Sequence, residues 1–171
     1  MTDSWQEARL GQDPTPYRLS RPGEMARAVA LLAGQARRDL RVWTRDLEPR
    51  LYDTRDFLDA VKALALASRV AEIRFLVGDA RRAMQLGHRL PELARQMSSA
   101  IAIRRIPPAN ADQPEAYLVV DRQGYLHRAV AEQGEGVLCL QDPLQATELE
   151  RAFDAVWDCA SAEPETRRLY L

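Results

Sequence analysis

The sequence contains few of the residues from which metal and redox sites are built. It has two histidines and two cysteines among 171 residues, and these four do not have the spacing of metal ligands. Cys139 and Cys159 do not form a CxxC pair, so we expect two free thiols, with Cys139 packed in the core. The sequence therefore predicts no metal site and no cofactor.

The motifs of several enzyme classes are missing as well. There is no GxGxxG fingerprint, no Walker A loop, no HExxH and no GxSxG. No apolar run approaches the roughly 18–20 residues of a membrane-spanning helix. The polar N-terminus does not have the pattern of a secretory signal. We therefore expect a cytoplasmic protein that makes no contact with a membrane.

Neither sign of charge is in excess. The 24 basic and 25 acidic side chains give a net charge of -1, so there is no overall attraction to nucleic acid. Lys62 is the only lysine, and every other basic residue is arginine, whose forked guanidinium suits carboxylates and phosphates. Local anion sites therefore stay open, although arginine richness also accompanies GC-rich coding.

The patterning that is present predicts one α/β domain. Helical patterns begin near residues 20–22, 53–54, 80 and 142–143. Strand patterns cover residues 40–44, 70–77, 101–106, 117–120, 125–130 and 136–140. Helices and strands alternate in the first part, which favours parallel pairing, and a strand meander follows, which favours antiparallel pairing. We expect a connecting loop at 46–51.

Three segments follow from this pattern. Residues 1–19 are polar and rich in turn formers, and they are expected to form a flexible arm that packs locally through Trp5 or Tyr17. Residues 20–160 form the α/β domain, and residues 161–171 form a C-terminal tail with an apolar end at 169–171.

His88 and Asp121 are the candidate chemical groups. His88 follows Gly87 at an expected helix start, where it could act as a general base or anion contact, or simply bond a backbone carbonyl. Asp121 ends the most hydrophobic strand, and acids at such strand ends often line sites in α/β sheets. An aspartate that bonds its own turn is the alternative. His127 is expected on a strand surface.

The stretch Tyr117-Leu-Val-Val-Asp121-Arg-Gln-Gly124 resembles the strand and turn that end the HxKxxxxD motif of the phospholipase D superfamily. In that family the histidine is the nucleophile or its acid partner, the lysine holds phosphate, and the aspartate supports the histidine. With Asp121 as the motif aspartate, Pro114 and Ala116 stand where the histidine and lysine belong. The resemblance therefore implies a degenerate site.

A wider resemblance covers about residues 25–171. Segments 46–53, 87–90 and 98–104 look like an uncharacterised bacterial family of phospholipase D-like domains. This implies a single phospholipase D-like domain, with a mixed sheet flanked by helices. Active members of the superfamily join two motif-bearing halves, so the resemblance also implies that two chains could pair as a homodimer.

Three functions follow from these observations. The first is a non-catalytic binding or regulatory domain, whose partner is an anion, a nucleic acid or a protein. Its candidate binding residues are His88, Arg89, Arg104, Asp121 and Arg128. The second is a divergent phosphodiesterase in which His88 replaces the missing histidine. The third is a protein-interaction module that uses the apolar end at 169–171 and the arm around Trp5.

Overall fold

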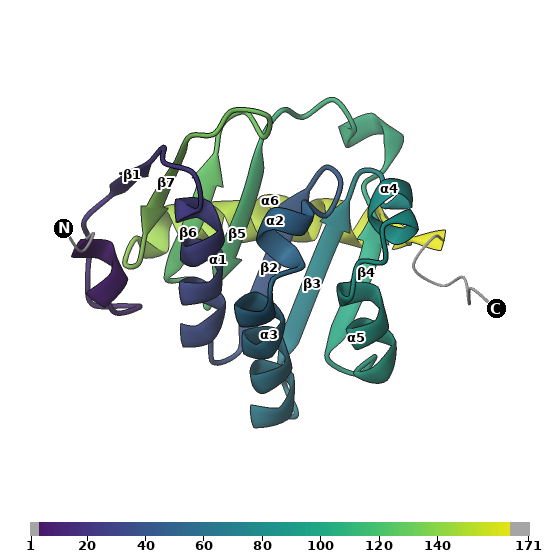
Figure 1. Ribbon diagram of the computed structural model, residues 1–171, viewed down its shortest axis with the longest axis horizontal. Coiled ribbons are helices and arrows are strands. Elements are labelled where there is room, and N and C mark those ends of the chain that lie inside the picture. The colour runs from purple at the N-terminus through teal and green to yellow at the C-terminus, as the bar shows by residue number, and fades with distance from the viewer. Residues whose placement is uncertain (1–3, 165–171) are drawn as a thin grey trace.

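A mixed sheet of eight strands runs through the molecule in the order β1-β7-β6-β5-β2-β3-β4-β8 (Figure 1). The computed structural model describes residues 4–164. The strands are β1 Tyr17–Leu19, β2 Asp39–Thr44, β3 Glu72–Val77, β4 Ile101–Arg105, β5 Ala116–Val120, β6 Gly124–Arg128, β7 Gly136–Cys139 and β8 Ser161–Ala162. The apolar end at 169–171 lies outside the described residues.

The centre of the sheet is parallel and its flanks are antiparallel. Strands β2, β3 and β4 pair in parallel, whereas β5 runs antiparallel to β2 and begins the meander through β6 and β7. The predicted change from crossover helices to a meander is therefore confirmed. Two short strands, β1 and β8, close the edges by pairing with β7 and β4.

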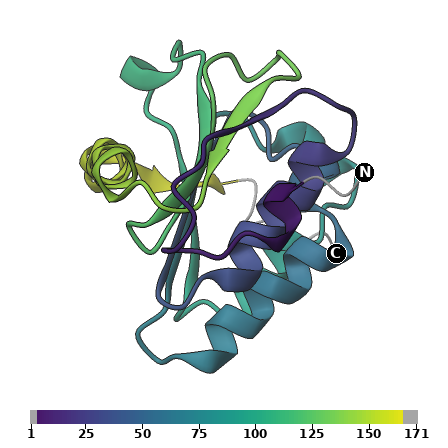
Figure 2. The ribbon, with the colours of Figure 1, turned by 90° about the vertical axis from the view of Figure 1, so that its left-hand side faces the viewer.

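The helices lie in two layers. They are α1 Glu24–Gln35, α2 Pro49–Tyr52, α3 Arg55–Ala67, α4 Arg81–Gln85, α5 Leu90–Gln96 and α6 Pro143–Cys159, with 3-10 turns η1 Ser4–Glu7 and η2 Pro108–Asn110. Figure 2 shows α6 alone on one face of the sheet and the other helices on the opposite face.

Local sequence signals set the beginnings of two helices. The Thr54 hydroxyl accepts the backbone N–H of Phe57 at the start of α3. At the start of α6, the Asp142 carboxylate accepts the N–H of Gln145, and Pro143 takes the first helical position. Both caps satisfy N–H groups that have no partner within the helix, as the sequence predicts.

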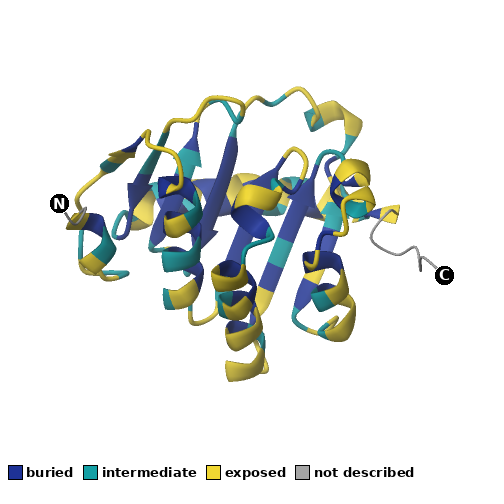
Figure 3. Cartoon of the chain, viewed as in Figure 1, coloured by how far each residue is buried: buried dark blue, intermediate teal, exposed yellow. Residues whose placement is uncertain are grey.

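The sheet separates two hydrophobic cores because both of its faces are covered (Figure 3). Alternate residues of β2 point to opposite sides, so Leu40 and Val42 pack under α1 and α3 while Trp43 packs under α6. Phe153 and Trp157 of α6 complete the second core and stack at a centroid distance of 5.7 Å. The core strands are consequently buried along nearly their whole length.

Two segments differ from the sequence-based expectation. Residues 46–51, predicted as a loop, contain most of the short helix α2, which begins at Pro49 because proline suits the first helical turn. Residues 4–19, part of the predicted flexible arm, contribute η1 and β1, whereas the predicted local packing of Trp5 is confirmed, since it is only 4% exposed. The arm is packed on the domain, since its backbone pairs with β7.

A buried arginine joins the sheet to α6. Arg41 of β2 is 4% exposed, and its Nε donates to Asp154 Oδ1 at 2.8 Å. Its guanidinium also lies 3.5 Å from Glu150, the residue one helical turn before Asp154. Removal of a single partner from a buried ion pair leaves a charge without compensation, which costs several kcal/mol. Arg41 and α6 therefore depend on each other.

Replacement of Arg41 should destabilise the fold strongly. We expect Arg41→Ala to lower the free energy of unfolding by about 3–5 kcal/mol, because Glu150 stays buried with less compensation. Urea denaturation followed by circular dichroism measures this. Arg74→Ala is the matched control, since its side chain is 26% exposed and pairs at 3.4–3.5 Å, and it should cost only about 1 kcal/mol. Equal losses of unfolding free energy for the two variants would contradict this role of Arg41.

Candidate functional site

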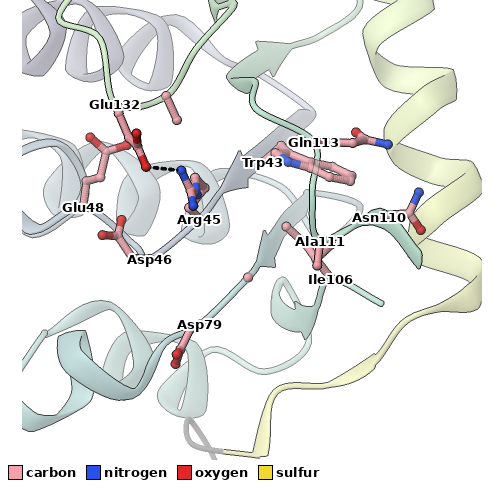
Figure 4. Close-up of a pocket in the computed structure, with 12 residues that line it drawn as sticks. Trp43, Arg45, Asp46, Glu48, Asp79, Ile106, Asn110, Ala111, Gln113 and Glu132 are labelled. Atoms are coloured by element: carbon pink, nitrogen blue, oxygen red, sulfur yellow. Dashed lines mark hydrogen bonds and ion pairs between the residues drawn. The ribbon is translucent and has the colours of Figure 1, made fainter. Parts of the chain in front are cut away.

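A pocket of about 540 Å³ opens where the central parallel strands end (Figure 4). We call it the strand-end pocket. It is lined by Trp43, Arg45, Asp46, Glu48, Gly78, Asp79, Ile106, Asn110, Ala111, Gln113, Ala131 and Glu132. Figure 4 shows Asp46, Glu48 and Glu132 around Arg45 on one side, and Trp43, Asn110 and Gln113 on the other.

The fold brings these residues together from distant parts of the chain. Because β2 and β3 are parallel and in register, Thr44 and Val77 end at the same edge of the sheet. The residues after each strand therefore enter one space, as ligand sites in open α/β sheets do. Gly78 lies so close to the neighbouring backbone that a Cβ there would approach the Arg45 carbonyl oxygen to 2.8 Å. Only glycine fits that position.

The lining of the strand-end pocket is predominantly acidic. Three of its four carboxylates have an arginine partner: Glu132 pairs with Arg45, Glu48 with Arg128, and Asp79 with Arg81. Hydrogen bonds from Arg81 lower the pKa of Asp79 to about 2. Of these three arginines, only Arg45 is itself part of the lining.

Asp46 is the carboxylate without a partner. It forms no hydrogen bond or ion pair with the residues that the structure describes. Partial burial raises its pKa, the nearby Glu48 carboxylate raises it further, and the charges of Arg45, Arg128 and Arg82 partly offset the shift. A further positive group at Asp46 would reduce the repulsion between Asp46 and Glu48.

His88 lies outside the strand-end pocket and is fully engaged. It is 6% exposed, its Nε2 donates to the Leu47 carbonyl at 2.9 Å, and its Nδ1 accepts the N–H of Leu90 at 3.2 Å. This pattern requires the neutral ring with the proton on Nε2. Burial lowers the pKa of His88, which keeps it neutral. The structural alternative for His88, a bond to a backbone carbonyl, is therefore the one observed.

Asp121 holds a turn at the other end of the sheet. Its Oδ2 accepts the backbone N–H of Arg37 at 2.7 Å, and its Oδ1 accepts those of Arg38 and Asp39 at 2.9 and 2.8 Å. These donors precede β2 or begin it, whereas His88 bonds to Leu47, beyond its end. The six residues of β2 span about 17 Å. His88 and Asp121 therefore do not share a site, a question that the sequence leaves open.

The three candidate arginines are also separated and occupied. Arg89 donates to Asp53 at 2.8 Å. Arg104 lies 4.3 Å from the centroid of the Trp157 ring and donates to the Trp157 carbonyl at 2.7 Å. Arg128 is 5% exposed and pairs with Glu48. Of the five predicted binding residues, only Arg128 forms a hydrogen bond or ion pair with a residue that lines the strand-end pocket.

The residues aligned with the missing catalytic groups lie near this pocket. Pro114 follows Gln113 of the lining, and Ala116 is the first residue of β5. No histidine lines the strand-end pocket. His127 instead pairs with Glu115 at 2.9 Å and lines a separate hollow of about 320 Å³. The lining thus contains no histidine beside Pro114, where the resemblance places the motif histidine.

None of the five binding residues predicted from the sequence lines the strand-end pocket. Arg45 and Asp46 directly follow a predicted strand, and Gly78 and Asp79 follow the next one. Two consecutive parallel strands with polar residues after each are themselves a signal for a site. Within residues 4–164, no group of three or more His, Cys, Asp and Glu side chains could hold a metal ion.

The family of the chain follows from a sequence comparison. The family described as "Domain of unknown function (DUF7931)" matches residues 21–169. The chain belongs to this family. No curated protein matches this DUF7931 member at a significant level. Among the described residues, none of the helices has the length and apolar character needed to cross a bilayer.

Solved structures show which fold this DUF7931 domain has. Nuc from Salmonella typhimurium, a phospholipase D family member, matches with a TM-score of 0.59 and 13% identity, over 88% of this chain and 99% of Nuc. Phosphatidylserine synthase from Haemophilus influenzae Rd KW20 matches with 0.59 and 14%, over 92% and 41%. TrmBL2, an archaeal chromatin protein, matches with 0.60 and 9%, over 86% and 54%. The chain has a phospholipase D-like fold.

Loss of the Asp121 carboxylate should unfold the domain more easily. Asp121→Ala removes three hydrogen bonds, and Asp121 also has a positive φ of 50°, which alanine tolerates poorly. We expect a loss of about 2–4 kcal/mol in the free energy of unfolding, measured by urea denaturation. Asp112→Ala, at an exposed position in the loop before β5, is the control and should change it by less than about 0.5 kcal/mol. An equally small change in the free energy of unfolding for Asp121→Ala would contradict the role of Asp121 in holding this turn.

Proposed function

We propose that this DUF7931 domain is a non-catalytic binding domain derived from a phospholipase D-like fold, with the strand-end pocket as its binding site. The observation that carries the proposal is the composition of this pocket. Pro114 and Ala116 stand at the aligned catalytic positions, and no histidine lines the cavity. The fold thus retains a hollow at the strand ends without the groups for phosphodiester chemistry.

The charges of the pocket support a ligand with a positive group. The lining carries four carboxylates and one guanidinium, and Asp46 is available to pair with a cation. A phosphate in the same place would face carboxylates with only Arg45 to compensate, and Arg45 is already paired with Glu132. An ammonium or guanidinium group is therefore the chemistry that the pocket suits.

The structure gives little support to a divergent phosphodiesterase that uses His88. A nucleophilic histidine needs a free ring nitrogen that faces the substrate. Both ring nitrogens of His88 are bonded to backbone groups, and the side chain is buried away from the strand-end pocket. The His127–Glu115 pair is the only other histidine arrangement in the chain, and it belongs to a different hollow.

The absence of catalysis can be tested directly. We expect the purified protein to hydrolyse bis(4-nitrophenyl) phosphate no faster than buffer does, with an active phospholipase D-type nuclease as the positive control. His88→Ala and His127→Ala should give the same background as the unaltered chain. Turnover that disappears in either folded variant would identify a catalytic histidine and refute the proposal. Turnover that is equal in all three proteins would exclude both histidines as its source.

Binding of a cation can be tested with agmatine, which carries a guanidinium and an ammonium group. Agmatine should shift the indole N–H NMR signal of Trp43, and Asp46→Asn should weaken its binding on the order of fivefold. Affinity should fall as the pH is lowered from 7 through the raised pKa of Asp46, because the protonated carboxyl loses its charge.

The control for this experiment is Asp59→Asn, at an exposed position of α3 away from the pocket. It should bind agmatine like the unaltered protein. Equal affinity for Asp46→Asn and Asp59→Asn would show that Asp46 does not bind the cation.

A further inference from the structure

A second hollow lies at the end of the sheet opposite to the strand-end pocket. It has a volume of about 550 Å³, and we call it the arm pocket. Three segments line it: the N-terminal arm, the end of α1 with the following turn, and the β5–β6 turn. The lining residues are Arg9, Leu10, Gln12, Gly34, Gln35, Ala36, Arg37, Asp121 and Gln123.

Specific hydrogen bonds hold the arm in this position. The Gln35 side chain of α1 accepts the N–H of Leu10 at 2.7 Å and donates to the Ala8 carbonyl at 3.0 Å. The N–H of Gly11 donates to the Leu140 carbonyl at 2.7 Å. The N-terminal arm, which forms one wall of the arm pocket, is therefore held in place by both α1 and the segment after β7.

The arm pocket carries two uncompensated guanidinium groups. The side chains of Arg9 and Arg37 are exposed, and neither forms a hydrogen bond or ion pair with the described residues. The one acidic residue of the lining is Asp121, and both of its oxygens already accept backbone N–H groups. Two positive groups thus line one hollow with a single carboxylate, so arginines outnumber acids in its lining.

We propose that the arm pocket binds a phosphate group through Arg9 and Arg37. The planar guanidinium fork matches the oxygens of a phosphate, and a dianion would neutralise both side chains. The side-chain amides of Gln12 and Gln123 line the same hollow and supply further donors. This site goes beyond the proposed function, because it lies at the opposite end of β2 and shares no residue with the strand-end pocket.

The charge distribution makes this the better anion site of the two. The strand-end pocket has four carboxylates against one arginine, whereas the arm pocket has two arginines against one saturated carboxylate. The phospholipase D resemblance implies phosphate binding at the lysine position, which is Ala116 at the start of β5, whereas the arm pocket lies beside Asp121 at the end of that strand.

The experiment is a titration with inorganic pyrophosphate and, separately, with a short single-stranded DNA, each followed by isothermal titration calorimetry at two salt concentrations. Arg9→Gln and Arg37→Gln should each weaken binding about fivefold, and the double variant more. These variants keep the backbone N–H of Arg37 that Asp121 accepts, so the turn should stay intact.

Arg151→Gln is the matched control, because it removes the same charge from an exposed position on α6. It should bind both probes like the unaltered protein. Asp46→Asn should also leave pyrophosphate binding unchanged, so failure of this proposal is distinguishable from failure of the cation site.

The two probes separate the sources of phosphate. Binding of pyrophosphate alone supports a small phosphate ligand, and tighter, steeply salt-dependent binding of DNA supports a nucleic-acid backbone. Either result supports the site only if the Arg9 and Arg37 variants lose affinity. Binding of neither probe, or equal binding by Arg9→Gln, Arg37→Gln and Arg151→Gln, would overturn the proposal.

Discussion

The ion pairs of the buried Arg41 are the interaction on which the rest of the architecture depends. Both faces of β2 are covered, so the charge of Arg41 must be paired within the protein. Asp39 and Glu72 lie 3.7 and 3.5 Å from its guanidinium within the sheet, and the other partners come from the layer above. Glu150 and Asp154 supply them from one face of α6, at the helical spacing of four residues. This fixes the rotation of α6 and thereby places Phe153 and Trp157 in the second core. The helix is held by charge as well as by apolar burial.

The two ends of this sheet differ in the charge of the residues that surround them. The carboxyl ends of β2 and β3 carry Arg45, Asp46 and Asp79 into the strand-end pocket. In the turn before β2, Asp121 accepts the backbone N–H of Arg37, whose side chain forms no hydrogen bond or ion pair with the described residues. Parallel strands therefore separate an acidic hollow from a basic one by the length of a strand. A protein with a net charge of only -1 can thus present two distinct ionic surfaces.

Much of the fold could be predicted from local patterns, and most of the site could not. Strand alternation and the caps at Thr54 and Asp142 involve neighbours a few residues apart, so the sequence displays them directly. The partners of the candidate groups are distant: Glu48 lies 80 residues from Arg128, and Leu47 lies 41 residues from His88. No local sequence pattern predicts pairs that are so far apart along the chain. The short strands β1 and β8 are likewise too brief to show a period, and only their pairing with β7 and β4 defines them.

Asp121 stands where the resemblance to the phospholipase D superfamily places the motif aspartate, and in this structure it has a structural role. The resemblance implies an aspartate that supports a histidine, and it aligns Pro114 with that histidine. Both carboxylate oxygens of Asp121 accept hydrogen bonds from the N–H groups of residues 37–39. These bonds connect the β5–β6 turn to the start of β2. The need for that turn is independent of any reaction, because the donors would otherwise lack a protein partner. The turn alone therefore accounts for an aspartate at this position.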